Sequence, residues 1–274
     1  MSLAELFPDT DYQFHFRFER GEAANFFGRT DANESLLTER RRWLLDNPRR
    51  YAALLPEATK LLDEAIALAA LFGVPIPPAP SGEHEIERAW SRCLALGAGW
   101  EPDFLLLKSD ETGAVRLVGG SVCFPSGWSL EEKIGHPIEM IHGVVPGLNA
   151  AIGPQIQGFL TRLRPGIAWL RSNWGASRGA ELNQHPARAL PRLDATVSLD
   201  EVWLRVERQA LLSLPCSLGI LFGIRIELHP LSKIAADHEL ASRLTRALRT
   251  MPEALARYKG LASSREKLLE HLGR

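Results

Sequence analysis

This sequence lacks a basic excess, a long apolar run and a recognisable targeting segment. The 274 residues carry a formal net charge of -1, which does not favour nucleic acid or an anionic membrane surface as a partner. No segment reaches the about 18 uninterrupted apolar residues of a membrane helix, and the first residues lack the charged and apolar regions of a signal peptide. We therefore expect a cytoplasmic protein without a membrane or nucleic-acid partner.

Cysteine clusters and nucleotide motifs are also missing. The three cysteines, Cys93, Cys123 and Cys216, are far apart and show no CxxC spacing, which argues against a disulfide framework and against a zinc or iron–sulfur site. The sequence contains no GxGxxG or P-loop pattern, and Ser126 does not lie in a GxSxG elbow. Nucleotide binding and serine catalysis therefore have no support.

Hydrophobic periodicity predicts helices near both chain ends and strands between them. Helical spacing covers residues 31–47, 57–73, 83–97 and 154–163, and again most of the chain from residue 232. Strand patterns cover residues 12–18, 104–108, 115–124, 167–174, 202–207 and 220–229. This order favours an α+β fold around an antiparallel sheet. We expect one domain over residues 1–274, with a helical layer at 1–97, a sheet core at 98–231 and helices at 232–274.

Residues 175–196 form a polar stretch that is rich in turn residues. A loop of this length in a compact domain is usually functional or mobile. It could cover a pocket or dock a partner protein, and the sequence does not separate the two.

Two histidines, His136 and His142, lie in a segment rich in glycine and proline. Their spacing of six is not that of a helical metal pair, and no carboxylate stands at ligand spacing, so a two-histidine iron site is weakly supported. A haem iron needs only one imidazole, with Met140, Ile141, Val144 and Val145 as a pocket wall. The alternative is a core histidine that donates to a backbone carbonyl.

Several arginines and tryptophans lie in or beside the predicted strands. Buried arginines need partners, and either an internal glutamate or a haem propionate would serve for Arg171, Arg205, Arg208 and Arg225. The tryptophans could be core residues or the lining of a flat cofactor pocket.

Three segments together resemble one known family. They are FPSGWSLEEKIGHPIEMIHGVVP (124–146), RSNW (171–174) and LRVERQALLSLPCSLGILFGIRIELHPL (204–231). They are similar to the alpha subunit of haem-dependent oxidative N-demethylases. The resemblance implies a PAS-like α+β domain with added helices that binds haem b. It further implies oxidative removal of a methyl group from a small secondary or tertiary amine by O2, with release of formaldehyde.

The same resemblance implies the cofactor contacts and the partner. His142 matches the axial iron ligand, with His136 as a second choice, and Arg205 and Arg225 match arginines that could contact the haem. Electrons would come from NADPH through a separate flavin and iron–sulfur subunit. The sequence departs from the family pattern at Gly143-Val144, where a proline is common, and at Ala210, where threonine is common. The alternatives are a haem-binding PAS-like sensor or carrier without turnover, and a structural protein without haem.

Overall fold

The structure is a computed structural model that describes residues 3–30, 34–78 and 84–273. The described residues form a seven-stranded sheet in the order β1-β5-β6-β7-β3-β4-β2, in which every pairing is antiparallel. The strands are β1 (Glu19–Gly21), β2 (Ala52–Leu54), β3 (Asp103–Ser109), β4 (Val115–Ser121), β5 (Ala168–Arg178), β6 (Val202–Ser213) and β7 (Ile220–Pro230). Together with the helices, this sheet confirms the predicted α+β class. The PAS-like assignment stays a prediction.

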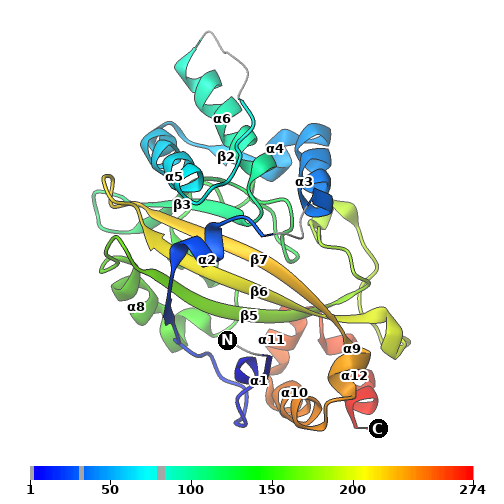
Figure 1. The fold of residues 1–274 in the computed structure, drawn as a ribbon. Coiled ribbons are helices and arrows are strands. Elements are labelled where there is room, and N and C mark those ends of the chain that lie inside the picture. The colour runs from blue at the N-terminus through cyan, green and yellow to red at the C-terminus, as the bar shows by residue number, and fades with distance from the viewer. Residues whose placement is uncertain (1–2, 31–33, 79–83, 274) are drawn as a thin grey trace.

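The helices surround this sheet, as Figure 1 shows. The first group precedes the β3–β4 hairpin: α1 (Leu3–Leu6), α2 (Ala23–Phe27), α3 (Glu34–Asp46), α4 (Pro48–Tyr51), α5 (Thr59–Leu71) and α6 (Glu85–Gly99). Next come α7 (Ile138–Gly143) and α8 (Leu148–Leu160), between β4 and β5. The chain ends with α9 (Leu231–Ala235), α10 (His238–Thr250), α11 (Glu253–Tyr258) and α12 (Arg265–Leu272). No helix among the described residues is long and apolar enough to cross a membrane.

Most predicted elements occur, with shifted ends. The predicted helices at 31–47, 57–73 and 83–97 correspond to α3, α5 and α6, although positions 31–33 and 83 lie outside the described residues. The predicted helix at 154–163 is α8, which begins six residues earlier, so that Pro154 lies inside it. β5 continues to Arg178 and takes the first residues of the predicted 175–196 loop into the sheet. The sequence did not predict the short elements α1, α2, α4, α7, β1 and β2.

The predicted strand at residues 12–18 is wrong, although the side chains there do alternate between half-buried and exposed. Tyr12, Phe14, Phe16 and Phe18 are half-buried, and the residues between them are exposed. The backbone joins the sheet only at β1, where Glu19 pairs with Leu170 of β5. Burial of every second side chain requires an extended chain, whereas a strand also requires a neighbour to bond with. Residues 12–18 are extended but have no neighbouring strand to bond with among the described residues.

Two buried side chains tie the helical layer to the sheet. Arg40 of α3, which is fully buried, donates from Nε to the carbonyl oxygen of Gly97 at 2.8 Å and from Nη1 to Asp103 Oδ1 at 2.7 Å. Asp103 in turn accepts from the backbone N–H groups of Cys123 at 2.7 Å and Phe124 at 3.0 Å. This one carboxylate therefore holds α3 and the start of the segment that leads to α7.

Replacing this carboxylate should destabilise the whole fold. Asp103→Ala leaves the Arg40 guanidinium buried without its counter-charge, and such a change lowers the free energy of unfolding by about 3–5 kcal/mol. Urea denaturation followed by circular dichroism measures the loss. The control is Asp9→Ala, whose carboxylate is 73% exposed in its pair with Arg246; it should cost about 1 kcal/mol or less. Equal losses in the two variants would contradict the assigned role of Asp103.

Candidate functional site

A cavity of about 330 Å³ lies between the sheet, the N-terminal segment and the helices on either side. Its volume is at the lower end of the range typical of ligand sites. The sheet contributes residues of β3, β5, β6 and β7. α7 and α8 form one wall, and residues 6–18, α10 and the end of α11 form another. Two histidines line it, His15 and His142.

His142 reaches the cavity from the last turn of α7. This short helix begins after Pro137, whose φ of -61° suits the entry to a helix. His142 is half-buried, and burial together with the charge of Arg171 lowers the pKa of its imidazole to about 4. At neutral pH the ring is therefore uncharged and retains a lone pair for a metal or a hydrogen bond.

The other residues expected around His142 are divided between the cavity and the solvent. Val145 lines the cavity, whereas Met140 and Val144 are 59% and 53% exposed. His136 is exposed and does not line the cavity; its backbone accepts from the N–H of Leu117. The structure therefore does not bring the two histidines together at one site. Among the described residues, no group of three or more histidine, cysteine, aspartate or glutamate side chains could hold a metal ion.

Aromatic side chains from distant parts of the chain form much of the wall. Trp174 of β5 packs edge-on against Phe7, with ring centroids 5.1 Å apart, and against Tyr12 at 6.4 Å. Phe18 stacks on Phe159 of α8 at 4.2 Å. Sequence reasoning did not find the N-terminal contribution, because 12–18 was interpreted as a strand with an exposed face. The regular spacing of Tyr12, Phe14 and Phe18 was the available signal.

Two cations line the cavity. Arg171 of β5 lies 5.6 Å from the centroid of the Phe18 ring, and burial lowers its pKa. No hydrogen bond or ion pair to the Arg171 side chain occurs within the described part of the chain. Lys259, just after α11, donates from Nζ to the carbonyl oxygen of Trp174 at 2.6 Å, and burial lowers its pKa to about 8. Both cations lack a carboxylate in direct contact, which makes them available to an acidic ligand group.

Arg205 and Arg225 lie elsewhere. Arg205 donates to the carbonyl oxygens of Phe124 at 2.7 Å and Leu182 at 2.6 Å, and joins two loops in this way. Arg225 pairs with Glu101 at 2.6 Å and donates to the carbonyl oxygen of Phe26 at 2.8 Å. Neither lines the cavity that contains His142. The structure thus shows internal pairing for both arginines and places Arg171 and Lys259 at the cavity instead.

The loop after β5 does not contribute to the cavity, since none of the lining residues comes from positions 175–196. Instead Asn183 donates to the hydroxyl of Tyr51 at 3.0 Å, and Gln184 bridges to Ser126. The loop therefore packs against α4 and against the segment before α7. The pocket-lid interpretation gains no support.

The cavity residues fit a haem in chemical character. A neutral imidazole could bind the iron, and apolar and aromatic walls would suit a flat macrocycle. Arg171 and Lys259, which have no carboxylate in contact, suit the two propionates. The residues that would hold haem are thus His142, Arg171 and Lys259, with aromatic side chains such as Phe14 and Trp174 around the ring.

The fold and the cavity define an α+β protein with a cavity between an antiparallel sheet and its flanking helices. The family described as haem-dependent oxidative N-demethylase, alpha subunit-like, matches residues 86–269. This range is about two thirds of the chain and includes α7, β5 and β6, so the chain belongs to this family. The residues of the N-terminal segment that line the cavity lie outside the matched range.

The low pKa of His142 should be measurable in the stability of the haem-free protein. Because the folded pKa is about 4, against 6.5 ordinarily, the folded state binds fewer protons than the unfolded state between these values. The contribution of His142 to stability is therefore complete above pH 6.5 and falls as the pH drops towards 4. Between pH 7 and pH 5, the wild type should lose more unfolding free energy in urea than His142→Gln. Identical losses would show that burial does not depress this pKa.

Proposed function

We propose that this chain is the haem-binding catalytic subunit of an oxidative N-demethylase. The reaction would remove a methyl group from a small secondary or tertiary amine, with O2 as oxidant and formaldehyde as product. The proposal depends on one observation: a neutral His142 and two cations, Arg171 and Lys259, line the same aromatic cavity. Membership of the family supports the same interpretation.

Each residue has a defined task in this proposal. His142 would hold the iron of haem b through its imidazole lone pair, and its low pKa keeps protons from competing for that nitrogen. Arg171 and Lys259 bind the propionates and fix the orientation of the macrocycle. When bound, haem supplies the binding and reductive activation of O2.

Electrons must come from outside this chain. The demethylation consumes one O2, two electrons and two protons for each methyl group, and releases formaldehyde, water and the demethylated amine. The described residues offer no cluster of cysteines for an iron–sulfur centre. The family description names an alpha subunit, which implies a partner subunit. We infer that a separate flavin and iron–sulfur subunit delivers electrons from NADPH.

Haem titration tests the iron ligand. The protein purified without haem should develop a sharp Soret band with about one equivalent of haemin, and the band should shift on reduction and on addition of carbon monoxide. His142→Ala should lose or markedly shift this band, because the axial imidazole is gone. His136→Ala serves as the matched control, since His136 is exposed and outside the cavity. His15→Ala is a second variant for comparison, because His15 also lines the cavity.

A wild-type protein that is folded but takes up no haemin would overturn the proposal. If haem binds, amine-dependent oxygen uptake with formaldehyde release, driven by an artificial reductant, distinguishes an enzyme from a sensor or carrier. A haem protein that consumes no oxygen with any N-methylamine would favour the sensor or carrier.

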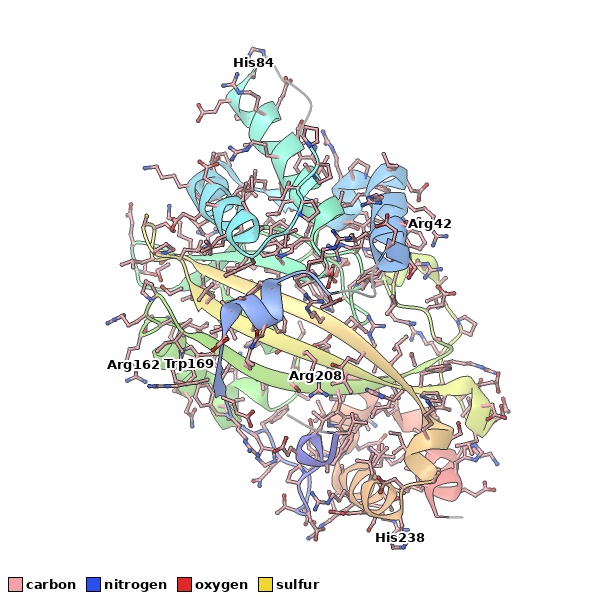
Figure 2. The ribbon with its side chains drawn as sticks, in the orientation of Figure 1. Arg42, His84, Arg162, Trp169, Arg208 and His238 are labelled. Carbon is pink, nitrogen blue, oxygen red and sulfur yellow. The ribbon has the colours of Figure 1, made fainter. Side chains whose placement is uncertain are left out.

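Removing either cation should weaken haem binding. Arg171→Leu and Lys259→Met should each raise the dissociation constant for haemin roughly tenfold or more, because a charge-assisted hydrogen bond is lost. The position of the Soret band should stay unchanged, since His142 is intact. Arg162→Leu is the control, because Arg162 is exposed on the surface after α8 (Figure 2). If the wild type and the three variants bind haemin with equal affinity, groups other than Arg171 and Lys259 bind the propionates.

A further inference from the structure

Three polar side chains form a hydrogen-bonded group at the sheet side of the cavity. Asn173 of β5 lies directly opposite Glu207 of β6, and Arg171 lies opposite Gln209. Side chains two residues apart on a strand, and those directly opposite on neighbouring strands, share one face of a sheet. Asn173, Glu207 and Gln209 therefore project from the same face, within the RSNW and LRVERQ segments of the sequence. The proposed function leaves these three side chains without a role.

One carboxylate oxygen orients both amides. Asn173 donates from Nδ2 to Glu207 Oε2 at 3.3 Å, and Gln209 donates from Nε2 to the same oxygen at 2.8 Å. A carboxylate accepts but does not donate, so an amide beside it must turn its NH2 group towards it. The carbonyl oxygens of Asn173 and Gln209 are consequently turned away from Glu207.

These amide oxygens are available to a ligand. Asn173 and Gln209 both line the cavity, whereas Glu207 does not and is only 9% exposed. Within the described ranges, neither Asn173 Oδ1 nor Gln209 Oε1 accepts a hydrogen bond. The cavity thus presents two acceptor oxygens on adjacent strands, with a buried negative charge behind them.

We propose that Asn173 and Gln209 bind the N–H groups of a protonated secondary amine, and that Glu207 positions both amides. This inference rests on the proposed function, since the amine is its substrate. A secondary ammonium ion carries two N–H donors, which match two acceptor oxygens. The rings of Trp174 and Tyr12 line the same cavity, and Lys259 Nζ lies 5.4 Å from the centroid of the Trp174 ring, so a cation is already accommodated beside these aromatic side chains.

The nearby positive charges weaken the binding of an ammonium ion unless they are neutralised. Arg171 and Lys259 line the same cavity, and the charge of Glu207 acts on both, as it does on Arg205. Arg205 is held by carbonyl oxygens outside the cavity. In the proposed function the propionates pair with Arg171 and Lys259. Glu207 then remains to attract the ammonium ion, so amine affinity should be higher in the haem-loaded protein than in the haem-free protein.

The number of N–H donors on the amine should decide the affinity. Dimethylammonium has two, trimethylammonium one and tetramethylammonium none. Loss of a hydrogen bond to a charged group weakens binding by about tenfold or more. We therefore expect the wild type to bind dimethylammonium about tenfold more tightly than trimethylammonium, and tetramethylammonium more weakly still.

The test is a titration of wild type and two variants with the three chloride salts. Binding is followed in the haem-free protein by NMR of the Asn173 and Gln209 side-chain amides, and in the haem-loaded protein by calorimetry. Gln209→Met removes one acceptor, and Glu207→Gln supplies an NH2 group that competes for the amide oxygens. Both should weaken dimethylammonium binding about tenfold or more. Gln209→Met should leave tetramethylammonium binding unchanged, whereas Glu207→Gln should weaken it to a smaller extent, because the charge that attracts the cation is lost.

The matched controls are Gln155→Met on α8 and Glu227→Gln on β7, whose side chains do not line the cavity. Both should bind all three ions as the wild type does. Equal wild-type affinities for the three ions would overturn the inference without any variant, as would unchanged dimethylammonium binding in the two folded variants. Failure of the proposed function appears separately, as the absence of a Soret band, and leaves the titration of the haem-free protein decisive.

Discussion

The register between β5 and β6 is the constraint on which the site depends. Antiparallel pairing from Ala168 with Leu212 to Arg178 with Val202 fixes which side chains face each other. Arg171, Asn173, Glu207 and Gln209 share one face for this reason alone. If β6 slipped by one residue along β5, Glu207 and Gln209 would project from the opposite face of the sheet to Arg171 and Asn173. The long β6–β7 hairpin, paired over its whole length, holds that register in place.

The cavity exists because one edge of this sheet is left open. β1 pairs with β5 only at residues 168–170, and the N-terminal segment then leaves the strand while remaining extended. Its aromatic side chains line the cavity: Tyr12 packs edge-on against Trp174 of β5, and the Arg171 guanidinium lies 5.6 Å from the centroid of the Phe18 ring. Lys259 bonds to the Trp174 carbonyl on β5.

The segment that carries His142 is anchored at a distance from the cavity. Asp103 binds the backbone of Cys123 and Phe124, and Arg205 binds the carbonyl of Phe124 from the other side. These contacts fix where the chain leaves β4, and Pro137 then starts α7. Arg205 therefore serves the site by holding the chain before α7. Arg205 can therefore affect the position of His142 without contacting the cavity.

The sequence by itself determined the class of fold and the family to which the chain belongs. Periodicity gave most helices and strands because local burial patterns repeat with the period of each element. The resemblance of residues 124–146 and 204–231 identified the family, and it singled out His142, which does line the cavity.

Only the tertiary structure decided which charged groups meet His142. Arg171, Arg205 and Arg225 all lie on strands, and sequence pattern cannot say which face of a particular strand opens on a cavity. Lys259 and the N-terminal aromatic residues are separated from His142 by more than a hundred residues of sequence, and no local signal links them. Such contacts arise from packing between elements, which depends on the register and on the unpaired edge of β5.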